Sequence, residues 1–246
     1  MDKNGAILGL QPPWMNSAGF MGFLPQPSPI GTLPFGAFVT NPISLTPRNP
    51  ARNRAVVQYP GGFLLHTGHP NPGLKSILKN YQQKWEHLTL PVWSHLLVQT
   101  AYECQQMVRV LEDVENVTAI ELSLPPGLTN KDQVDLIQAA TGELPVFVCI
   151  PVDVLEIRLV EQLPALGVAG IVLSAARGMI TQNGKNINGR LYGPALFPQL
   201  MRALCDLKGF GVLIIAGCGV FSLEQGEAAL AAGASAVQLD ALCWRF

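Results

Sequence analysis

Charged side chains are scarce in this chain of 246 residues. Asp, Glu, Lys and Arg together make up 13% of it, about half the share that is typical of globular proteins. Hydrophobic residues make up 48%, so we expect extensive burial or subunit contact and no long disordered region. The formal net charge of -1 gives no reason to expect nucleic acid or an anionic membrane as a partner.

Long apolar runs and paired cysteines are also missing. No uninterrupted apolar segment reaches the roughly 18 residues that a membrane-spanning helix needs, and residues 1–5 lead into no apolar core typical of a signal peptide. The five cysteines are scattered and form no Cys-x-x-Cys pair. We therefore expect a cytoplasmic protein with reduced thiols and no membrane partner.

The sequence does contain a regular alternation of apolar runs and helical patterns. Residues 211–240 form its clearest unit, in which an apolar strand, a glycine-rich turn, a helix that begins after Ser222 and a second apolar strand follow one another. We predict strands at 14–15, 35–40, 91–98, 118–122, 145–150, 168–173, 211–216 and 236–239. We predict helices at 74–85, 101–114, 130–140, 154–166, 195–207 and 222–233.

This order is typical of the α/β class, and eight strands that mostly alternate with helices predict a parallel barrel. We expect a single (β/α)8 TIM barrel domain over residues 1–246. It is expected to be shortened at the C-terminus, where a homodimer partner, another subunit or the N-terminal segment would cover the barrel. Segments 41–73 and 174–193 are predicted as long irregular loops, which often belong to a functional site.

The carboxyl ends of the strands form the functional site of a TIM barrel, and phosphate groups usually bind at the turns after the last two strands. The predicted strand ends hold Asn16, Ser17, Thr40, Asn41, Leu96, Leu97, Ser123, Leu124, Cys149, Ile150, Ser174, Ala175, Gly217, Cys218, Gly219 and Asp240. The cations expected near this end are the loop residues Arg48, Arg52, Arg177, Lys185 and Arg190. His66 and His69 lack a third ligand and do not share a helix, so no metal site is predicted.

Several short motifs occur along the chain in a particular order. They are Asn-Ser-Ala-Gly at 16–19, the strand 35–40 followed by Pro-Arg-Asn-Pro-Ala-Arg at 47–52, the glycines at 61–62 followed by 68–73, Gly-Arg-Leu-Tyr-Gly-Pro-Ala at 189–195, and the segments 216–220 and 232–238. In this order and spacing they resemble the motifs of the dihydroorotate dehydrogenase family, over almost the whole chain. The resemblance implies that FMN lies over the barrel mouth and oxidises dihydroorotate by hydride transfer, a reaction of pyrimidine biosynthesis.

The resemblance also implies roles for individual residues. The residues at the FMN positions are Ser17, Ala18, Gly19, Asn41, Gly193, Gly217, Cys218, Gly219 and Asp240, and those at the substrate positions are Asn71, Ser123 and Ser174. Lysines that the family places beside the flavin align with Asn41 and Cys149, and the loop that supplies its base appears as 121–126, with Leu124 in it. Leucine cannot accept a proton. Without the two lysines, the positive charge that would stabilise a reduced, anionic flavin is also missing.

The last strand ends on a carboxylate where the family has a Gly-Thr pair beside the phosphate. At about 4 Å and an effective dielectric of about 20, Asp240 would repel a phosphate by roughly 4 kcal/mol. Asp240 is either an acid or base for another ligand or a carboxylate that accepts backbone hydrogen bonds. Cys149 is either a nucleophile or a small apolar residue in the vacated lysine position.

Ser123, Glu121 and Cys149 are the candidate catalytic residues, and Glu121 shares one strand face with Ser123. Two functions stay open at this point. The first is an FMN-dependent oxidoreductase that acts on dihydroorotate or a similar ring with a rearranged base. The second is a barrel without flavin chemistry that serves as a binding protein or a partner subunit.

Overall fold

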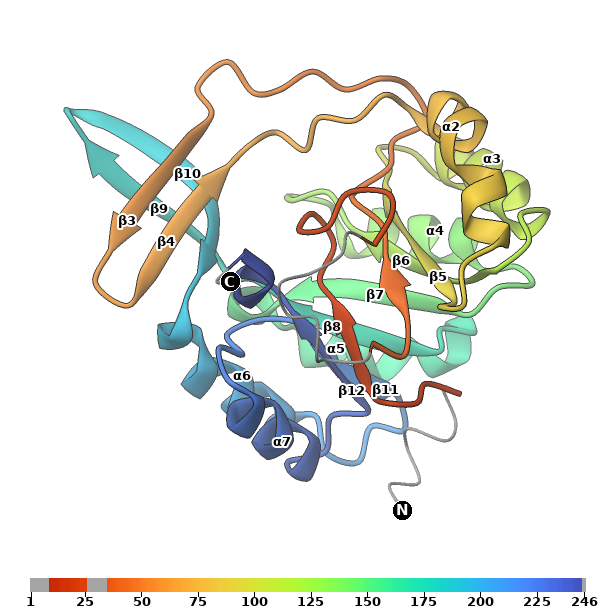
Figure 1. Ribbon diagram of the computed structural model, residues 1–246. Coiled ribbons are helices and arrows are strands. Elements are labelled where there is room, and N and C mark those ends of the chain that lie inside the picture. The colour runs from red at the N-terminus through yellow and green to blue at the C-terminus, as the bar shows by residue number, and fades with distance from the viewer. Residues whose placement is uncertain (1–8, 26–34, 245–246) are drawn as a thin grey trace.

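The computed structural model describes residues 9–25 and 35–244, and its centre is a ring of parallel strands (Figure 1). The strands are β1 (Trp14–Asn16), β2 (Phe38–Val39), β5 (Val92–Leu97), β6 (Val117–Ser123), β7 (Val146–Pro151), β8 (Gly170–Ser174), β11 (Leu213–Ala216) and β12 (Ala236–Leu239). They pair in the order β1-β12-β11-β8-β7-β6-β5-β2, and a parallel bridge between Met15 and Ala37 joins the two end strands. The predicted (β/α)8 TIM barrel is confirmed.

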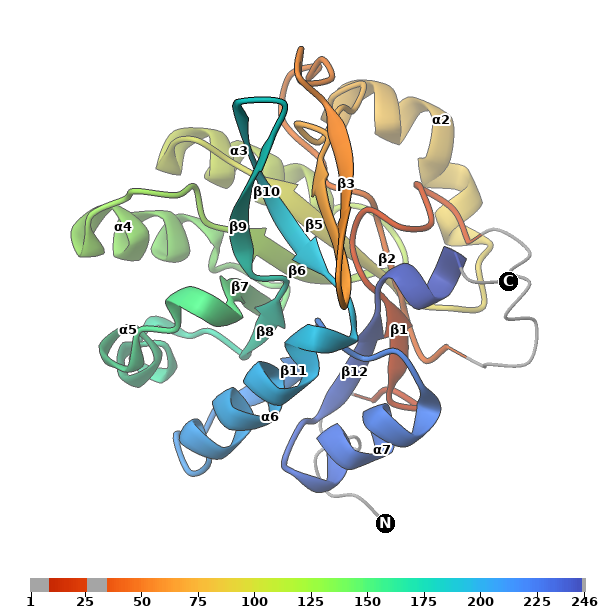
Figure 2. The ribbon, with the colours of Figure 1, turned by 90° about the vertical axis from the view of Figure 1, so that its left-hand side faces the viewer.

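Helices surround the ring on its outer side (Figure 2). They are α2 (Leu74–Glu86), α3 (Ala101–Glu112), α4 (Asn130–Ala140), α5 (Ile157–Gln162), α6 (Phe197–Asp206) and α7 (Leu223–Ala231). Side chains of Thr100, Thr129 and Ser222 accept backbone N–H groups at the starts of α3, α4 and α7, which explains where these helices begin.

One predicted helix was too long. The segment 154–166 contains α5 between two 3-10 turns, η1 (Val152–Val154) and η2 (Pro164–Leu166). Pro164 has no backbone N–H to donate within a helix, and Gly167 leaves the helix with a left-handed backbone at φ 75°. The apolar spacing of this segment therefore gave the right face but the wrong length.

The inside of the barrel is packed with side chains, as in other folds of this type. Alternate residues of the strands point inward, and Trp93 of β5 stacks on Phe147 of β7 with 4.5 Å between the ring centres. A larger apolar cluster fills the layer between the strands and the surrounding helices. Side chains at the carboxyl ends of the strands are thereby held on a rigid base.

Each of the two predicted loops contains a β-hairpin, so the predictions were wrong for the hairpin residues, whereas 41–54 and 67–73 form no named strand or helix. The first consists of β3 (Ala55–Tyr59) and β4 (Gly62–His66), and the second of β9 (Arg177–Gln182) and β10 (Lys185–Tyr192). The hairpins join into one sheet in the order β3-β4-β10-β9, which lies across the barrel in Figure 2. Asn183 and Gly184 turn between β9 and β10 with φ 52° and 71°, a dipeptide typical of tight hairpins.

The remaining features of the fold concern the end of the barrel and the thiols. The strand β12 is followed by a 3-10 turn, η4 (Ala241–Trp244). Within residues 9–25 and 35–244, no helix combines the length and the apolar character that crossing a membrane requires. All five cysteines are free thiols, and four of them are buried.

Candidate functional site

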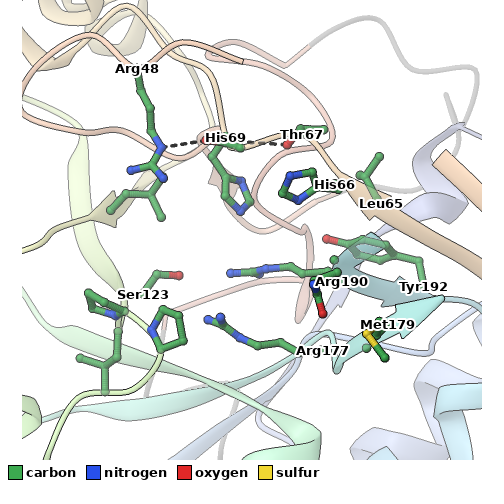
Figure 3. A pocket seen from close by; sticks show the side chains of 18 of the residues that line it. Arg48, Leu65, His66, Thr67, His69, Ser123, Arg177, Met179, Arg190 and Tyr192 are labelled. Atoms are coloured by element: carbon green, nitrogen blue, oxygen red, sulfur yellow. Dashed lines mark hydrogen bonds between the residues drawn. The ribbon is translucent and has the colours of Figure 1, made fainter. Parts of the chain in front are cut away.

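A pocket of about 890 Å³ lies between the hairpin sheet and the carboxyl ends of β5 and β6 (Figure 3). Its floor includes Ser123 and residues that follow β5 and β6, and its roof comes from β4, β9 and β10. The cations on its wall are Arg48, Arg177 and Arg190, accompanied by His66 and His69. The described residues that line it include no Asp or Glu, so the pocket is electropositive.

Two of the arginines are held next to each other by the hairpin. Arg177 and Arg190 are directly paired across β9 and β10, and both extend toward the side of the pocket where Ser123 lies (Figure 3). Arg48 comes from the opposite wall, and its Nε donates a hydrogen bond of 2.7 Å to the carbonyl oxygen of Gly68. Among the described residues, none of the three forms an ion pair with a carboxylate.

The charges affect one another. Burial, followed by the positive charge of Arg190, lowers the pKa of the Arg177 guanidinium. Burial and then Arg190 also lower the pKa of His69 to about 3, so that this imidazole is neutral near pH 7. A bound carboxylate would relieve this mutual repulsion, because it would place a negative charge among the cations.

A buried polar cluster lies directly below the pocket. His95 of β5 contacts two residues of β6, with its Nδ1 2.9 Å from Glu121 Oε2 and its Nε2 2.9 Å from the hydroxyl oxygen of Ser123. Cys149 of β7 completes the cluster, with its Sγ 3.9 Å from Glu121 Oε2. Gln238 of β12 donates a short hydrogen bond to Glu121 Oε1.

The structure thus brings together the three catalytic candidates, Glu121, Ser123 and Cys149, and adds two residues that sequence reasoning missed. The prediction that Glu121 and Ser123 share one face is correct. His95 was missed because its strand was read as a uniform apolar run. Its position two residues after Trp93, which points into the barrel, was the available signal. The atoms of His95, Glu121 and Cys149 that could bind a metal lie within 4.8 Å of one another.

The glycine-rich turn after β11 is filled by the protein itself. The backbone N–H of Ala241 donates a hydrogen bond to Asp240 Oδ1, and the backbone N–H of Gly219 also acts to lower the pKa of this carboxyl group. Gly217, Cys218, Gly219 and Asp240 are all buried. The backbone of Gly219 lies so close to α6 that a Cβ there would be 2.7 Å from the backbone nitrogen of Phe197.

This environment changes the acid–base behaviour of Asp240. Its carboxyl group is 1% exposed, and among the described residues its Oδ2 has no hydrogen-bond partner. Burial raises the pKa of Asp240 to about 7, against the lowering effect of the backbone N–H groups. Of the two alternatives for this residue, the structure contains the backbone-bonded carboxylate.

The centre of the barrel mouth, beside this turn, is nearly closed. Tyr192 stacks on Phe63 with ring centres 5.5 Å apart and meets Phe20 edge-on at 5.2 Å. The space that remains beneath it, bounded in part by Ser17, Ala18 and Ser174, is about 20 Å³. A space of this size holds about one water molecule, whereas pockets for small ligands measure roughly 300–1,000 Å³.

Comparison with known proteins identifies the group to which this barrel is related. A family model described as dihydroorotate dehydrogenase matches residues 4–245. The chain belongs to the dihydroorotate dehydrogenase family. The resemblance inferred from the motifs is therefore confirmed.

Individual relatives are distant. The chain is 26% identical to the "Dihydroorotate dehydrogenase B (NAD(+)), catalytic subunit" of Desulforamulus reducens, over 92% of this chain and 82% of the relative. Proteins of the same name from Methanocaldococcus jannaschii and Bacillus caldolyticus are 28% and 25% identical. These matches cover 83% and 94% of this chain and 74% and 80% of the relatives.

The residues at the family's FMN positions do not fit that group in this chain. Asn41 Oδ1 accepts a hydrogen bond from the backbone of Gly22 at 3.0 Å, and Gly193 lies against the backbone of Gly61. The large pocket is not lined by the turn 217–219, by 17–19 or by Asp240. A molecule that filled the large pocket would therefore not reach the turn where a flavin phosphate is expected.

The three residues at the family's substrate positions do not line one common pocket. Asn71 Oδ1 accepts hydrogen bonds from Ser44 and from the backbone of Gly73, which gives it a structural role in the segment before α2. Ser174 borders the small space in the barrel mouth, and among the described residues its hydroxyl oxygen has no partner. Of the three predicted substrate residues, Ser123 is the one that lines the large pocket.

Proposed function

We propose that this member of the dihydroorotate dehydrogenase family does not bind FMN and instead binds a small carboxylate-bearing molecule in the arginine-lined pocket. The single observation that carries the proposal is the position of Asp240. Its side chain accepts the backbone N–H of Ala241 after β12 and lies close enough to the backbone N–H of Gly219 to be affected by it, and both N–H groups would otherwise be available to a phosphate. The place of the family's phosphate is thus taken by a carboxyl group of the protein.

The chemistry of the large pocket supports the second half of the proposal. Guanidinium groups bind carboxylates through two parallel hydrogen bonds, and Arg177 and Arg190 offer such donors on one wall. The opposite wall contributes Arg48, and Leu65, which is paired with Arg190, and Leu124 add apolar surface. A flat ring that carries a carboxylate matches this combination of charge and apolar surface.

Calorimetric titration tests both parts of the proposal, that FMN does not bind and that a carboxylate binds in the large pocket. We expect dihydroorotate, used as a carboxylate probe, to bind the wild-type protein and FMN to release no heat of binding. An Arg190→Gln variant should bind the probe about 10- to 100-fold more weakly, because a charge-assisted hydrogen bond is lost. Arg202→Gln is the matched control, since Arg202 is exposed on α6 and pairs with Asp206. Micromolar binding of FMN, or a probe affinity that Arg190→Gln leaves unchanged, would contradict the proposal.

FMN-dependent oxidation of dihydroorotate is the alternative that family membership favours. It requires a base for a carbon-bound proton, and Ser123 with His95 behind it is the candidate that the geometry supports. It also requires room for a flavin beside the turn 217–219, which the packing of Tyr192 and Asp240 opposes. We therefore place this alternative second.

We also propose that a second protein chain covers the end of the barrel. The names of the relatives from Desulforamulus reducens and Methanocaldococcus jannaschii describe a catalytic subunit, which supports the prediction of a second copy or another subunit at the end of the barrel. The cytoplasmic location and the absence of a metal stay predictions.

A further inference from the structure

We propose that Ser123 is the nucleophile of an acyl-transfer site, with His95 as its base and Glu121 as the carboxylate that positions His95. The three side chains come from neighbouring strands, in which His95 is paired with Glu121 and Leu97 with Ser123. They form a continuous chain of hydrogen bonds, with 2.9 Å between Ser123 Oγ and His95 Nε2 and 2.9 Å between His95 Nδ1 and Glu121 Oε2. Serine, imidazole and carboxylate in this order define a catalytic triad by geometry.

The hydrogen bonds assign the roles. We assign the imidazole proton of His95 to Nδ1, where it donates to Glu121 Oε2, so that Nε2 accepts the Ser123 proton. Gln238 holds the other oxygen of Glu121, and the hydroxyl oxygen of Thr40 accepts a 3.1 Å hydrogen bond from the backbone nitrogen of His95. Glu121 and His95, the two groups that activate Ser123, are therefore fixed in place.

The exposed fraction of the three residues rises from the carboxylate through the imidazole to the serine. Glu121 is 1% exposed, His95 3% and Ser123 6%, and of the three only Ser123 lines the large pocket. The reactive atom thus faces the space for a ligand, while its base and carboxylate lie behind it. A purely structural polar cluster has no need to present its hydroxyl group to an arginine-lined pocket.

The neighbouring thiol is a poorer nucleophile in this setting. Cys149 lies behind Ser123, away from the large pocket, and its Sγ is 3.9 Å from Glu121 Oε2. Burial and then the negative charge of Glu121 raise the pKa of the Cys149 thiol well above its ordinary value. Cys149 is therefore a poor source of thiolate, and it does not line the large pocket, whereas Ser123 does.

The substrate class follows from the pocket. This step rests on the proposed function, because the arginines are taken to bind a carboxylate. We infer an ester or a cyclic amide that carries a separate carboxylate group. That carboxylate would contact Arg177 and Arg190, whose side chains extend toward the side of the pocket where Ser123 lies (Figure 3).

Water is the only co-reactant that this reaction needs. Ser123 Oγ forms a bond to the carbonyl carbon as His95 Nε2 takes the hydroxyl proton, and the C–O or C–N bond of the substrate then breaks. The proton on His95 passes to the leaving alcohol or amine. Water next attacks the acyl group on Ser123, gives a proton to His95 and releases a carboxylic acid, while the serine oxygen regains its proton from His95.

The test is covalent labelling of the full chain by phenylmethylsulfonyl fluoride, read by intact mass and peptide mapping. We expect one adduct, on Ser123, that is absent from Ser123→Ala. His95→Gln should lower the limiting rate of labelling about 100-fold or more. Glu121→Gln should lower the same rate without changing the reagent concentration that gives half of it. Ser94→Ala is the control, because Ser94 is a buried serine on β5, the strand of His95, and should leave the rate unchanged.

Three results would overturn the proposal. They are no labelling of the wild-type protein, labelling that persists in Ser123→Ala, and labelling that a chelator abolishes and zinc restores. The last result would assign His95, Glu121 and Cys149 to a metal. The circular dichroism spectrum of each variant shows whether it is folded. The reagent is uncharged, so its reaction does not depend on carboxylate binding, and failure of this proposal is distinguishable from failure of the proposed function.

Discussion

An Asp240→Asn variant is expected to become more stable relative to the wild-type protein as the pH rises from about 4 to about 7. Burial raises the pKa of Asp240 from 3.8 to about 7, so the folded protein holds this proton more tightly than the unfolded chain. The contribution to the free energy of unfolding is complete below pH 3.8 and is lost as the pH rises to about 7. Its size is about 4 kcal/mol, from about 1.4 kcal/mol for each unit of pKa.

The measurement is denaturant unfolding of both proteins from about pH 4 to about pH 8. The stability of the variant relative to the wild-type protein should rise by several kcal/mol across this range. His69 acts in the opposite direction, because its pKa is lowered to about 3 and its contribution is lost on acidification from about 6.5. Both proteins contain His69, so the difference between them isolates Asp240. Parallel curves would show that Asp240 is ionised throughout and that its site is more polar than described.

Gly193→Ala is expected to destabilise the protein by about 3 kcal/mol or more. Gly193 has φ 148°, and a Cβ there would be 2.1 Å from the carbonyl oxygen of Gly61 and 2.5 Å from the Cα of Gly62. These are backbone atoms in the turn before β4, which is paired with β10, so they cannot move without separating the hairpins. The melting temperature should fall by roughly 10 °C for a chain of this size.

The matched control is Gly184→Ala at the tip of the β9–β10 hairpin. Gly184 has φ 71°, and a Cβ there would meet no atom within 4 Å. This variant should lose only the cost of the left-handed backbone, about 1 kcal/mol. Equal losses in the two variants would mean that the backbone conformation, and not the contact with Gly61, restricts position 193.

The barrel could be predicted because its signal is local. Each buried parallel strand is a short apolar run, and helix starts such as Thr129 and Ser222 are marked by their own side chains. The hairpins were predicted as loops although Asn183 and Gly184 are a recognised hairpin signal. The prolines of segment 41–73 and the glycines and polar residues of segment 174–193 gave more weight to loops than to exposed strands.

The site could be predicted only in part, since it depends on contacts between distant segments. The strand period places Glu121 and Ser123 on one face, and the loop arginines were expected near the mouth. Pairing of His95 with Glu121 depends on the register of β5 and β6, which no single segment encodes. The same holds for Tyr192, which reaches the barrel mouth only because β10 pairs with β4.

The most direct test of the central claim, that the family's flavin site is filled by the protein itself, is the visible absorption spectrum of the protein after incubation with excess FMN and removal of the free cofactor. We expect no flavin band, because the Asp240 carboxylate occupies the phosphate turn and Tyr192 covers the barrel mouth. A flavin band at near-stoichiometric occupancy would contradict the account and would place FMN-dependent oxidation of dihydroorotate first.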